Sequence, residues 1–563
     1  MIKNGKYDDN WVVADFETTT EDFYLKYNYS KVWLWAIANN QGKTIKIGVD
    51  IESFIKYCVD NLNNYIIYFH NLKFDGSYIL SYLLSKKVPF KEKIMSKDNK
   101  CFNTVIGDMG QYYQITYHPR QKITFNFQDS LKLLPFKVSE IAKSFNLPML
   151  KLSIDYDNNS VNEHTIEYIK HDVEIVALAL KEIKALGMKK MTTARCAYDL
   201  YSKTNQFMYD YFPMLDVEFL EKWRLAYRGG RSQVNPRYKD VILHGVKRYD
   251  INSMYPYIMH DLPLPIGKPI KQDSIGQHKF ELYEVETQFH LKEGHLPSLL
   301  RKDSVFGESS YYIETDGIER ICISNIDYEI LKRHYDIDCI VFLEIYGFKT
   351  TVGLFNNYID YWYEIKKKNK GAKRIVAKLM LNSLYGKFGS RCIGKSKIPI
   401  LNDYNVLTHK LSEEQEMRHY YLPVAIAIVS YAHLLIDNAI VNTGVGYFVY
   451  CDTDSVHTLG SLDDELIDPV KLGKFKLEGT EETCRYVRQK TYVYREQIDN
   501  DYEYNIVCAG MNEEIKRYTI DTYKEDVFNV FTEGFKINNM KLMPTMVKGG
   551  IILTKTSFEI RVR

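Results

Sequence analysis

The chain has 563 residues, of which 45% are hydrophobic and 26% are charged, and its formal net charge at pH 7 is +2. This composition excludes a disordered protein, and the length predicts several domains because a single core rarely grows beyond about 250–300 residues. A net charge this close to zero indicates no particular partner. The basic run at residues 366–374 would suit a nucleic acid, although such a run is more often a solvated helix face.

Cysteine usage and hydropathy indicate the cellular compartment of the protein and whether it spans a membrane. The nine cysteines are scattered, without a Cys-x-x-Cys pair or a Cys/His cluster at zinc spacing, which predicts a reducing compartment and no structural zinc. The first residues lack the apolar core of a signal peptide. The most apolar segment, residues 422–436, is interrupted by Pro423, Ser430 and His433 and falls short of the about 20 residues that a bilayer span needs. We therefore expect a buried helix and no membrane span.

Four acids in the N-terminal third are expected at the ends of separate elements. They are Asp15 and Glu17 after the apolar run 12–14, Asp75 after the apolar run 65–69, and Asp172 on a helix face that also presents Tyr168. An amphipathic helix is expected over residues 78–84. Converging carboxylates can hold two metal ions and a tyrosine hydroxyl can orient an attacking water, so the set favours a two-metal nuclease. Each acid taken alone is more readily a helix cap or a surface group.

Residues 189–221 have a mixed helical pattern without identifiable chemistry, and the segment 227–230 follows them. The glycines Gly229 and Gly230 let the backbone approach a ligand closely, while Tyr227 and Arg228 can touch sugar and phosphate. As an isolated tetrapeptide this segment is a weak signal.

Residues 247–256 read as a strand that ends at Asp250 and a helix that opens at Ser253. An acid at a strand end suits a metal ion, and the carbonyl oxygen of Ile251 could add a ligand. Tyr255 is placed to pack under an incoming sugar, where its flat ring would leave no room for a 2′-hydroxyl. It could also be a core aromatic, and the two roles are compatible.

A helix is expected over residues 366–388, beginning at Lys366. Steps of four, four and three place a polar stripe on one of its faces. The stripe consists of Arg374, Lys378, Asn382 and Tyr385. Cations, an amide and a tyrosine in register suit the phosphates, sugar and base of a nucleotide better than a solvated helix face.

The runs 445–449 and 456–459 are rich in β-branched and aromatic residues and predict a hairpin with Asp452 and Asp454 at its tip. In an extended backbone, side chains two residues apart share a face at roughly 7 Å, so both carboxylates are expected to point the same way. They would repel each other unless a cation such as Mg²⁺ lay between them. A solvated Asp-Thr-Asp turn is the plainer interpretation of this stretch alone.

Taken together, these segments resemble the sequence motifs of protein-primed family B DNA polymerases, the group of the phage phi29 type. The exonuclease motifs are Asp15-Phe16-Glu17, Asn71-x-x-Phe74-Asp75 and Tyr168-x-x-x-Asp172. The linker motif is Tyr227-x-Gly229-Gly230, and the polymerase motifs lie at 250–256, 378–386 and 450–455, followed by Lys490-x-Tyr492. The resemblance extends from Asp15 to about Gly550.

The resemblance implies an α/β and α+β multidomain fold. An RNase H-like 3′–5′ exonuclease domain would precede a right-hand polymerase with palm, fingers, thumb and two inserted subdomains. The expected ranges are 1–190 for the exonuclease domain, 191–261 for the linker and the start of the palm, 262–350 for the first terminal-protein-region insert, 351–388 for the fingers, 389–421 for the second insert, 422–490 for the palm and 491–563 for the thumb.

The resemblance also implies roles for single residues. The metal ligands would be Asp15, Glu17, Asp75 and Asp172 in the nuclease site, and Asp250, Ile251, Asp452 and Asp454 in the polymerase site. Tyr168 and Lys151 would complete the catalytic set, although Lys151 could also be a surface lysine. The nucleotide would contact Tyr255, Lys366, Arg374, Lys378, Asn382 and Tyr385. DNA would contact Thr18, His70, Asn71, Phe74, Ser130, Leu131, Tyr227, Gly229, Gly230, Lys490 and Tyr492.

The implied activity is DNA-directed DNA synthesis with proofreading and strand displacement, and the implied cofactor is Mg²⁺, which Mn²⁺ could replace. The enzyme would replicate a viral genome in the host bacterial cytoplasm. The implied partners of a monomeric enzyme are primer-template DNA, dNTPs, a terminal protein and a viral single-stranded-DNA-binding protein. A DNA-primed family B polymerase, a stand-alone two-metal nuclease and a non-catalytic scaffold remain as alternatives. A dNTP-dependent primer-extension assay separates the polymerases from the other two.

One segment departs from the family pattern. The family usually has Thr-x-x-Gly/Ala-Arg after the second insert, whereas this chain has Val429-Ser430-Tyr431-Ala432-His433. If His433 met a template phosphate, replacing it with arginine should tighten primer-template binding and steepen its salt dependence.

Overall fold

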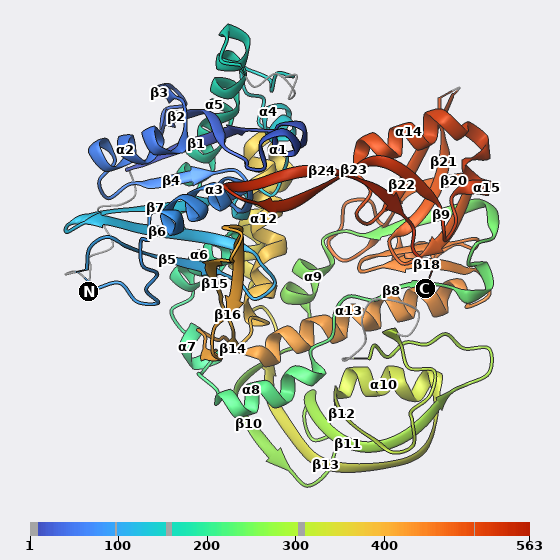
Figure 1. Cartoon of the computed structure of the whole chain (residues 1–563). Helices are drawn as coiled ribbons and strands as arrows, with labels where there is room; N and C mark the ends of the chain where they lie inside the picture. Colours follow the sequence, from blue (N-terminus) through green and yellow to red (C-terminus); the bar gives the residue numbers. More distant parts are fainter. Residues whose placement is uncertain (1–9, 96–97, 154–159, 302–309, 500, 563) are drawn as a thin grey trace.

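The computed structural model describes residues 10–95, 98–153, 160–301, 310–499 and 501–562. The first nine residues, where no signal peptide is expected, lie outside this part. The described chain forms an N-terminal body around a mixed sheet and a second body around an antiparallel sheet, with further β-rich segments beside them (Figure 1).

The N-terminal sheet has the strand order β3-β2-β1-β4-β7-β6-β5, and β4 runs parallel to both β1 and β7. Its strands are β1 (Trp11–Thr18), β2 (Val32–Asn39), β3 (Thr44–Gly48), β4 (Ile66–Phe69), β5 (Cys101–Ile106), β6 (Tyr112–Arg120) and β7 (Ile123–Asp129). Helix α5 (Glu163–Ala185) packs on β1 and β2. The apolar residues of β1 are buried, as the sequence predicts, and hold its acids at the edge of the core.

Helix α3 begins earlier than expected. It spans Leu72–Ser85 and not 78–84, and Asn71 before it takes a left-handed φ of 77°. It is buried on most of its sides because it packs against β7, β6 and the C-terminal strand β24 (Gly550–Glu559), so the expected amphipathic pattern is wrong. Asp75 consequently lies in the first turn of a helix and not in a loop.

The second sheet has the strand order β22-β21-β20-β9-β19-β18-β8. Its strands are β8 (Ser232–Val234), β9 (Ile242–Ile251), β18 (Phe448–Asp452), β19 (Ser455–Thr458), β20 (Phe475–Arg488), β21 (Thr491–Ile498) and β22 (Asp501–Cys508). The predicted hairpin around the acidic pair is formed by β18 and β19. The expected boundary between palm and thumb at 490/491 falls inside this continuous sheet.

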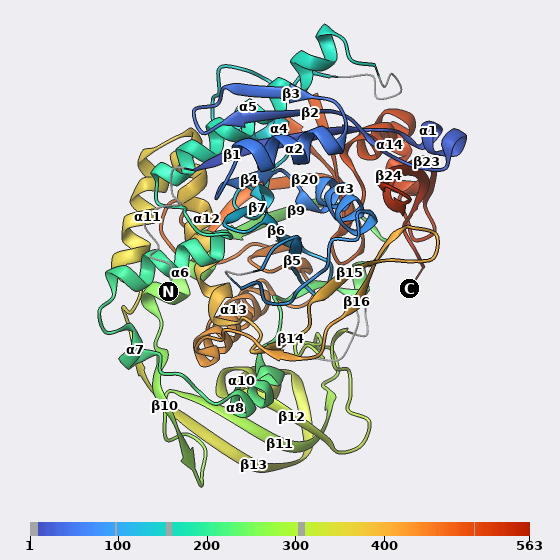
Figure 2. The ribbon, with the colours of Figure 1, turned by 60° about the vertical axis from the view of Figure 1, so that its left-hand side comes forward.

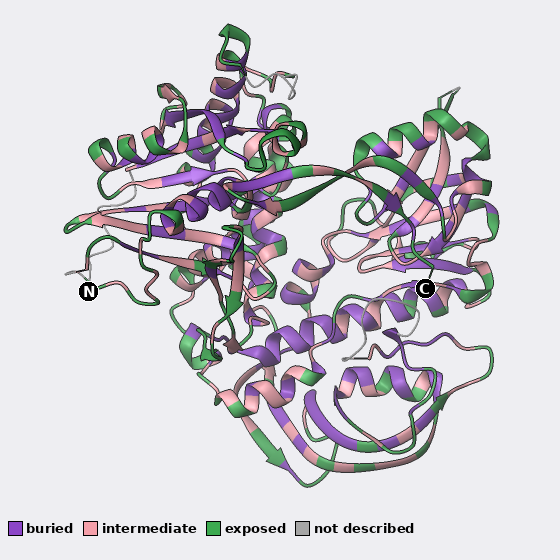
Figure 3. Cartoon of the chain, in the orientation of Figure 1, coloured by how far each residue is buried: buried purple, intermediate pink, exposed green. Residues whose placement is uncertain are grey.

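Helix α13 (Leu422–Thr443) lies between this sheet and the β-rich segment below it (Figures 1 and 2). Its 22 residues exceed the expected length, because Pro423 occupies the first turn, where proline is tolerated, and does not interrupt the helix. Among the described residues, it is the helix long and apolar enough to cross a membrane. However, 72% of its most apolar window is buried (Figure 3), as in the core helix of a globular protein.

The expected single helix over 366–388 is interrupted. Helix α11 (Asn356–Lys368) ends two residues after Lys366, and helix α12 (Gly371–Phe388) begins three residues after that end, with Gly371 at a φ of 60°. The positive φ favours glycine and lets the chain turn between the helices. Lys366 therefore lies on a different helix from the polar stripe.

Smaller sheets fill the two ranges expected for the inserts. The first contains helix α10 (Asn325–His334) and a sheet of β10 (Leu264–Gln272), β13 (Tyr335–Thr351), β11 (Phe280–Leu291) and β12 (Glu319–Ser324). The second contains the pairs β14 (Ile393–Gly394) with β17 (Gln415–Glu416) and β15 (Lys397–Leu401) with β16 (Leu407–Leu411).

A C-terminal hairpin of β23 (Lys536–Val547) and β24 crosses from the second body to the N-terminal body (Figure 1). At its turn, the carbonyl of Lys548 accepts a hydrogen bond from the amide of Ser30 at 2.8 Å. Lys548 also forms a β-bridge with Val406, which precedes β16. The hairpin thus joins the two bodies and the second insert.

Candidate active sites

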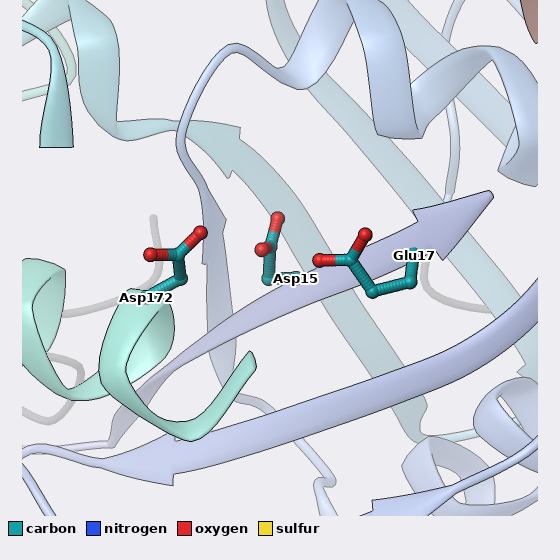
Figure 4. A group of neighbouring side chains, drawn as sticks. All are labelled: Asp15, Glu17 and Asp172. Carbon is teal, nitrogen blue, oxygen red and sulfur yellow. The ribbon is translucent and has the colours of Figure 1, made fainter. Parts of the chain in front are cut away.

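Strand β1 and helix α5 bring three of the predicted nuclease acids together. Asp15, Glu17 and Asp172 each offer a carboxylate oxygen, and these oxygens all lie within 4.8 Å of one another. Figure 4 shows Asp15 between the other two, with Asp15 and Glu17 on the strand and Asp172 on the helix. The convergence predicted from distant parts of the sequence is present.

This cluster has the electrostatics of a cation site. Burial, followed by the nearby Asp172, raises the pKa of Asp15 to about 7. Burial and then Asp15 raise the pKa of Glu17 well above its ordinary value. One oxygen of Asp172 is buried without a hydrogen-bond partner among the described residues. Crowded carboxylates with an unused buried oxygen fit a divalent ion, which prefers oxygen ligands and relieves their repulsion.

Asp75, Lys151 and Tyr168 surround the cluster. Asp75 is 3% exposed, and burial, followed by the charge of Asp15, raises its pKa well above the ordinary value. Lys151 forms an ion pair with Asp172, and its Nζ lies 4.8 Å from the centre of the Tyr168 ring. The interpretation of Lys151 as an uninvolved surface lysine is therefore wrong.

The residues expected to hold single-stranded DNA divide into two groups. Thr18, Asn71, Phe74 and Leu131 are exposed or half-buried beside the cluster. Ser130 is completely buried, and its hydroxyl donates to the carbonyl of Phe69 at 3.0 Å. Its expected direct contact with DNA is therefore wrong, because its side chain bonds His70 Nδ1 at 3.0 Å and lies beneath the surface. The second nitrogen of His70 lies 2.7 Å from the carbonyl of Phe136, so His70 is also held inside the fold.

Asp129 is a supporting residue that sequence reasoning missed. It is 2% exposed, and one of its oxygens accepts from the amides of Asn71, Leu72 and Leu131 at 3.1, 3.3 and 3.0 Å. This single carboxylate fixes two of the loops that carry expected DNA contacts. Its place at the end of β7, directly before the Ser130-Leu131 pair, was the available signal.

In the second body, the pairing of β9 with β19 brings Asp250 to Asp454. Asp250 is the register partner of Ser455, and the amide of Ile251 donates to the carbonyl of Asp454 at 2.8 Å. Burial, followed by the charge of Asp454, raises the pKa of Asp250 to about 7. Burial also raises the pKa of Asp454. Asp250 and Asp454 are thus a second pair of crowded carboxylates, and a divalent ion would relieve their repulsion.

Asp452 and Asp454 do not share the face of an extended strand, so the expected arrangement of this pair is wrong. Thr453 between them has a φ of 61°, and the amide of Asp454 donates back to the carbonyl of Asp452 at 2.7 Å, so the pair lies in a tight turn. Lys490 donates to both oxygens of Asp452 at 2.7 Å. Lys490, expected to grip DNA, thus neutralises the auxiliary acid, while Tyr492 of the same motif stacks on Tyr486 at 4.9 Å.

Helices α11 and α12 place the predicted nucleotide-binding side chains opposite Asp250. Arg374, Lys378 and Asn382 are exposed along one stripe of α12. Tyr385, at the end of the stripe, stacks on Tyr255 with ring centres 4.1 Å apart. Lys366 joins them from α11, because its Nζ donates to the hydroxyl of Ser253 at 2.9 Å and its carbonyl accepts from Arg374 at 2.9 Å.

The segment 227–230 lies beside the acidic turn, but the expected phosphate contact of Arg228 is wrong. Arg228 is 5% exposed and its Nε donates to the carbonyl of Leu300 at 2.9 Å, so it is not available to DNA phosphates. His433 is 6% exposed, and its ring nitrogens lie 2.7 Å from the carbonyl of Gly229 and 3.1 Å from Asp327. Both nitrogens are engaged inside the fold, which argues against a template-binding role at this departure from the family pattern.

The nuclease cluster predicts how metal removal affects stability. The pKa of Asp15 is raised from 3.8 to about 7 in the folded protein, so the folded state retains a proton that the unfolded state has lost. Without metal, the free energy of unfolding should therefore fall as the pH rises from about 4 to about 7 and stay low above pH 7.

We expect the Asp15→Asn variant in EDTA to melt several degrees above the unaltered protein at pH 8, corresponding to about 1–3 kcal/mol. The two proteins should melt at similar temperatures at pH 5, where Asp15 is protonated. Differential scanning calorimetry measures the melting temperatures of both proteins. Added Mg²⁺ at pH 8 should raise the melting temperature of the unaltered protein more than that of the variant. Equal melting temperatures at pH 8 in EDTA would contradict the cluster's electrostatics.

Comparisons with known proteins agree with this geometry. The family model described as DNA polymerase type B, organellar and viral, matches residues 58–166 and 157–471. The chain is 33% identical to the DNA polymerase of Bacillus phage Nf over 97% of this chain and 99% of the relative. It is 34% identical to that of Bacillus phage phi29 over 97% of this chain and 98% of the relative. The structure is similar to Phi29 DNA polymerase complexed with primer-template DNA and incoming nucleotide substrates, with a TM-score of 0.87 and 32% identity over 98% of this chain and 100% of that chain.

Proposed function

The chain belongs to the protein-primed family B DNA polymerases of the phi29 type, and from this premise we propose that it copies a viral genome and proofreads its own product. It is accordingly a DNA-directed DNA polymerase with an exonuclease activity. Substrates of this class are primer-template DNA and dNTPs, in keeping with the solved complex of its relative.

In the synthetic site, Asp250 and Asp454 would hold divalent ions, with the carbonyl of Ile251 and Asp452 as additional oxygens. Mg²⁺, or Mn²⁺ in its place, supplies activation of the attacking 3′-hydroxyl and stabilisation of the leaving pyrophosphate when bound. Asp452 is paired with Lys490, so an ion at this acid would compete with the lysine for its oxygens. This proposal rests most directly on the register that brings Asp250 beside Asp454.

The residues facing this site would bind the incoming nucleotide. Lys366, Arg374 and Lys378 neutralise the triphosphate, since Lys366 and Lys378 place positive charge beside Asp250 and Arg374 lies against Lys366. Asn382 offers an amide to the sugar or base. Tyr255 and Tyr385 frame the nascent pair through their stacked rings, and the ring of Tyr255 excludes a 2′-hydroxyl by its bulk.

In the trimming site, Asp15, Glu17, Asp75 and Asp172 would hold the ions that activate water against the terminal phosphodiester. The hydroxyl of Tyr168 orients this water, and Lys151 stabilises charge at the scissile phosphate. Thr18, Asn71, Phe74 and Leu131 receive the frayed 3′ end without reading its sequence, because rings and aliphatic side chains stack on any base.

A stand-alone nuclease is the alternative from another class, and it leaves the nucleotide stripe on α12 without a purpose. A DNA-primed polymerase is the alternative within family B as a whole. The two inserts favour protein priming, because they occupy the places of the family's terminal-protein regions. A further expected partner of the monomeric enzyme is a viral single-stranded-DNA-binding protein. The expected setting is the cytoplasm of the bacterial host.

Protein priming is tested by incubating the full chain with labelled dATP, Mg²⁺ or Mn²⁺, and a candidate terminal protein. We expect label attached covalently to protein in the absence of any DNA primer, because a protein hydroxyl takes the place of the 3′-hydroxyl. Denaturing gel electrophoresis detects the adduct, and heat-inactivated terminal protein is the control. Labelling of DNA primers alone would favour the DNA-primed alternative.

A further inference from the structure

Residues 228–232, called here the seat segment, support the turn that carries Asp452 and Asp454. The amide of Thr453, between the two acids, donates to the carbonyl of Arg231 at 2.7 Å. Ser232 is the register partner of Asp452 where β8 pairs with β18. A Cβ added at Gly230 would lie 2.9 Å from Thr453 Oγ1, so glycine permits this close approach. A displacement of the seat segment is therefore passed directly to the acidic turn.

The first insert holds the seat segment from the other side. Strand β8 is the last strand of its sheet, so its outward peptide groups have no neighbouring strand to bond. The hydroxyl of Tyr311 fills this place, because it donates to the carbonyl of Ser232 and accepts from its amide, both at 3.0 Å. Arg228 is anchored in the same insert through the carbonyl of Leu300.

Helix α13 provides a second attachment through His433. Its Nε2 lies 2.7 Å from the carbonyl oxygen of Gly229, and its Nδ1 lies 3.1 Å from a carboxylate oxygen of Asp327 of α10. The other oxygen of Asp327 accepts from Ser430 at 2.6 Å and from Ser324 at 3.0 Å, so its position is fixed as well. His433 thus joins the palm helix, the insert and the seat segment in one buried network.

Arg231 provides a third attachment of the seat segment. Arg231 donates to Asp437 of α13 at 3.0 Å, and both side chains are buried. Its guanidinium also donates to the carbonyl of Pro297 in the insert at 3.4 Å. The seat segment is therefore fixed between α13 and the insert at three residues, Gly229, Arg231 and Ser232.

We propose that Tyr311 and His433 are positioning residues of the synthetic site, through which the first insert sets the place of the Asp452–Asp454 turn relative to Asp250. Neither touches a substrate, and each acts through the backbone of the seat segment. The inference rests on the proposed function of these acids as metal ligands. Residues that orient metal ligands without touching the metal affect metal affinity and reaction rate. The first insert, the expected terminal-protein region, would therefore help to set the geometry of the synthetic site.

The test uses the full chain with Tyr311→Phe, His433→Ala and His433→Gln. Tyr312→Phe is the matched control, because it removes the hydroxyl of the neighbouring buried tyrosine in the same insert, which donates to Glu319 and not to the seat segment. Hydrogen–deuterium exchange is measured in peptides covering 228–234 and 450–456. Incorporation and exonuclease rates are measured against Mg²⁺ concentration.

We expect Tyr311→Phe and His433→Ala to speed exchange in both peptides by about tenfold or more, because each removes the hydrogen bonds that its side chain makes in the buried network. Incorporation should fall by about tenfold and need more Mg²⁺ for half its maximal rate, while exonuclease keeps its rate and its Mg²⁺ midpoint. His433→Gln retains a donor for Gly229 and should recover part of the loss. Tyr312→Phe should change none of these.

The proposal is overturned if exchange rises at 228–234 alone while incorporation stays unchanged, or if Tyr312→Phe has the same effects as Tyr311→Phe. A parallel fall of exonuclease would also overturn it, since that would indicate general destabilisation. If the unaltered protein incorporates no nucleotide, the proposed function fails, while the exchange measurement still decides whether the insert positions the turn.

Discussion

Replacing Asp454 with alanine should abolish nucleotide incorporation while exonuclease activity remains. Asp454 lies at the tip of the β18–β19 hairpin, where its neighbour Asp250 has a pKa raised to about 7 by burial and by the charge of Asp454. Removing one of two facing carboxylates leaves too few oxygens to hold the ions that activate the hydroxyl and stabilise pyrophosphate. A loss of several kcal/mol of transition-state stabilisation corresponds to about 10³-fold or more in rate.

Extension of a 5′-labelled primer with dNTPs measures this loss, and degradation of the same primer without dNTPs measures what remains. The preserved degradation shows that the variant is folded. Asp463→Ala is a matched control, because Asp463 is an exposed aspartate beyond the same hairpin and outside the site. Retained incorporation in Asp454→Ala would remove this acid from the synthetic site.

The double replacement Asp15→Ala with Asp75→Ala should have the opposite effect. Asp75 is buried and Asp15 is half-buried near Glu17, and both have raised pKa values because desolvation and the charges of neighbouring carboxylates oppose their ionisation. Their loss removes oxygens from the trimming site and leaves the second body unchanged. Exonuclease should therefore fall by about 10³-fold or more, for the same energetic reason, while incorporation continues.

Degradation of a single-stranded oligonucleotide measures the trimming activity, and misincorporation during extension measures proofreading. The variant should accumulate more mismatches because it extends them without removing them. Asp60→Ala, at an exposed position of the same body, is the control. If both activities disappear together in a folded variant, the assignment of separate sites is wrong.

Local patterns predicted these sites where the chemistry depends on the ends of regular elements. The apolar run before Asp15, the strand before Asp250 and the hairpin around Asp454 all form as expected, because alternating or buried strands determine which residues reach their ends. The polar stripe on α12 follows from helical spacing alone.

The failures share a physical cause, because they depend on contacts between distant segments. The turn at Thr453 is stabilised by the carbonyl of Arg231, which no local pattern around residue 453 contains. Arg228 and His433 are residue types that often contact DNA, but here they are buried among the first insert and α13. Lys490 is drawn to Asp452 across the sheet.

We propose that the chain holds divalent ions in two separate carboxylate sites, one for synthesis and one for trimming. Anomalous diffraction from crystals soaked in Mn²⁺ tests it most directly. We expect density among Asp15, Glu17 and Asp172 and a separate peak between Asp250 and Asp454. Peaks confined to one of these places, or lying away from both, would contradict the account.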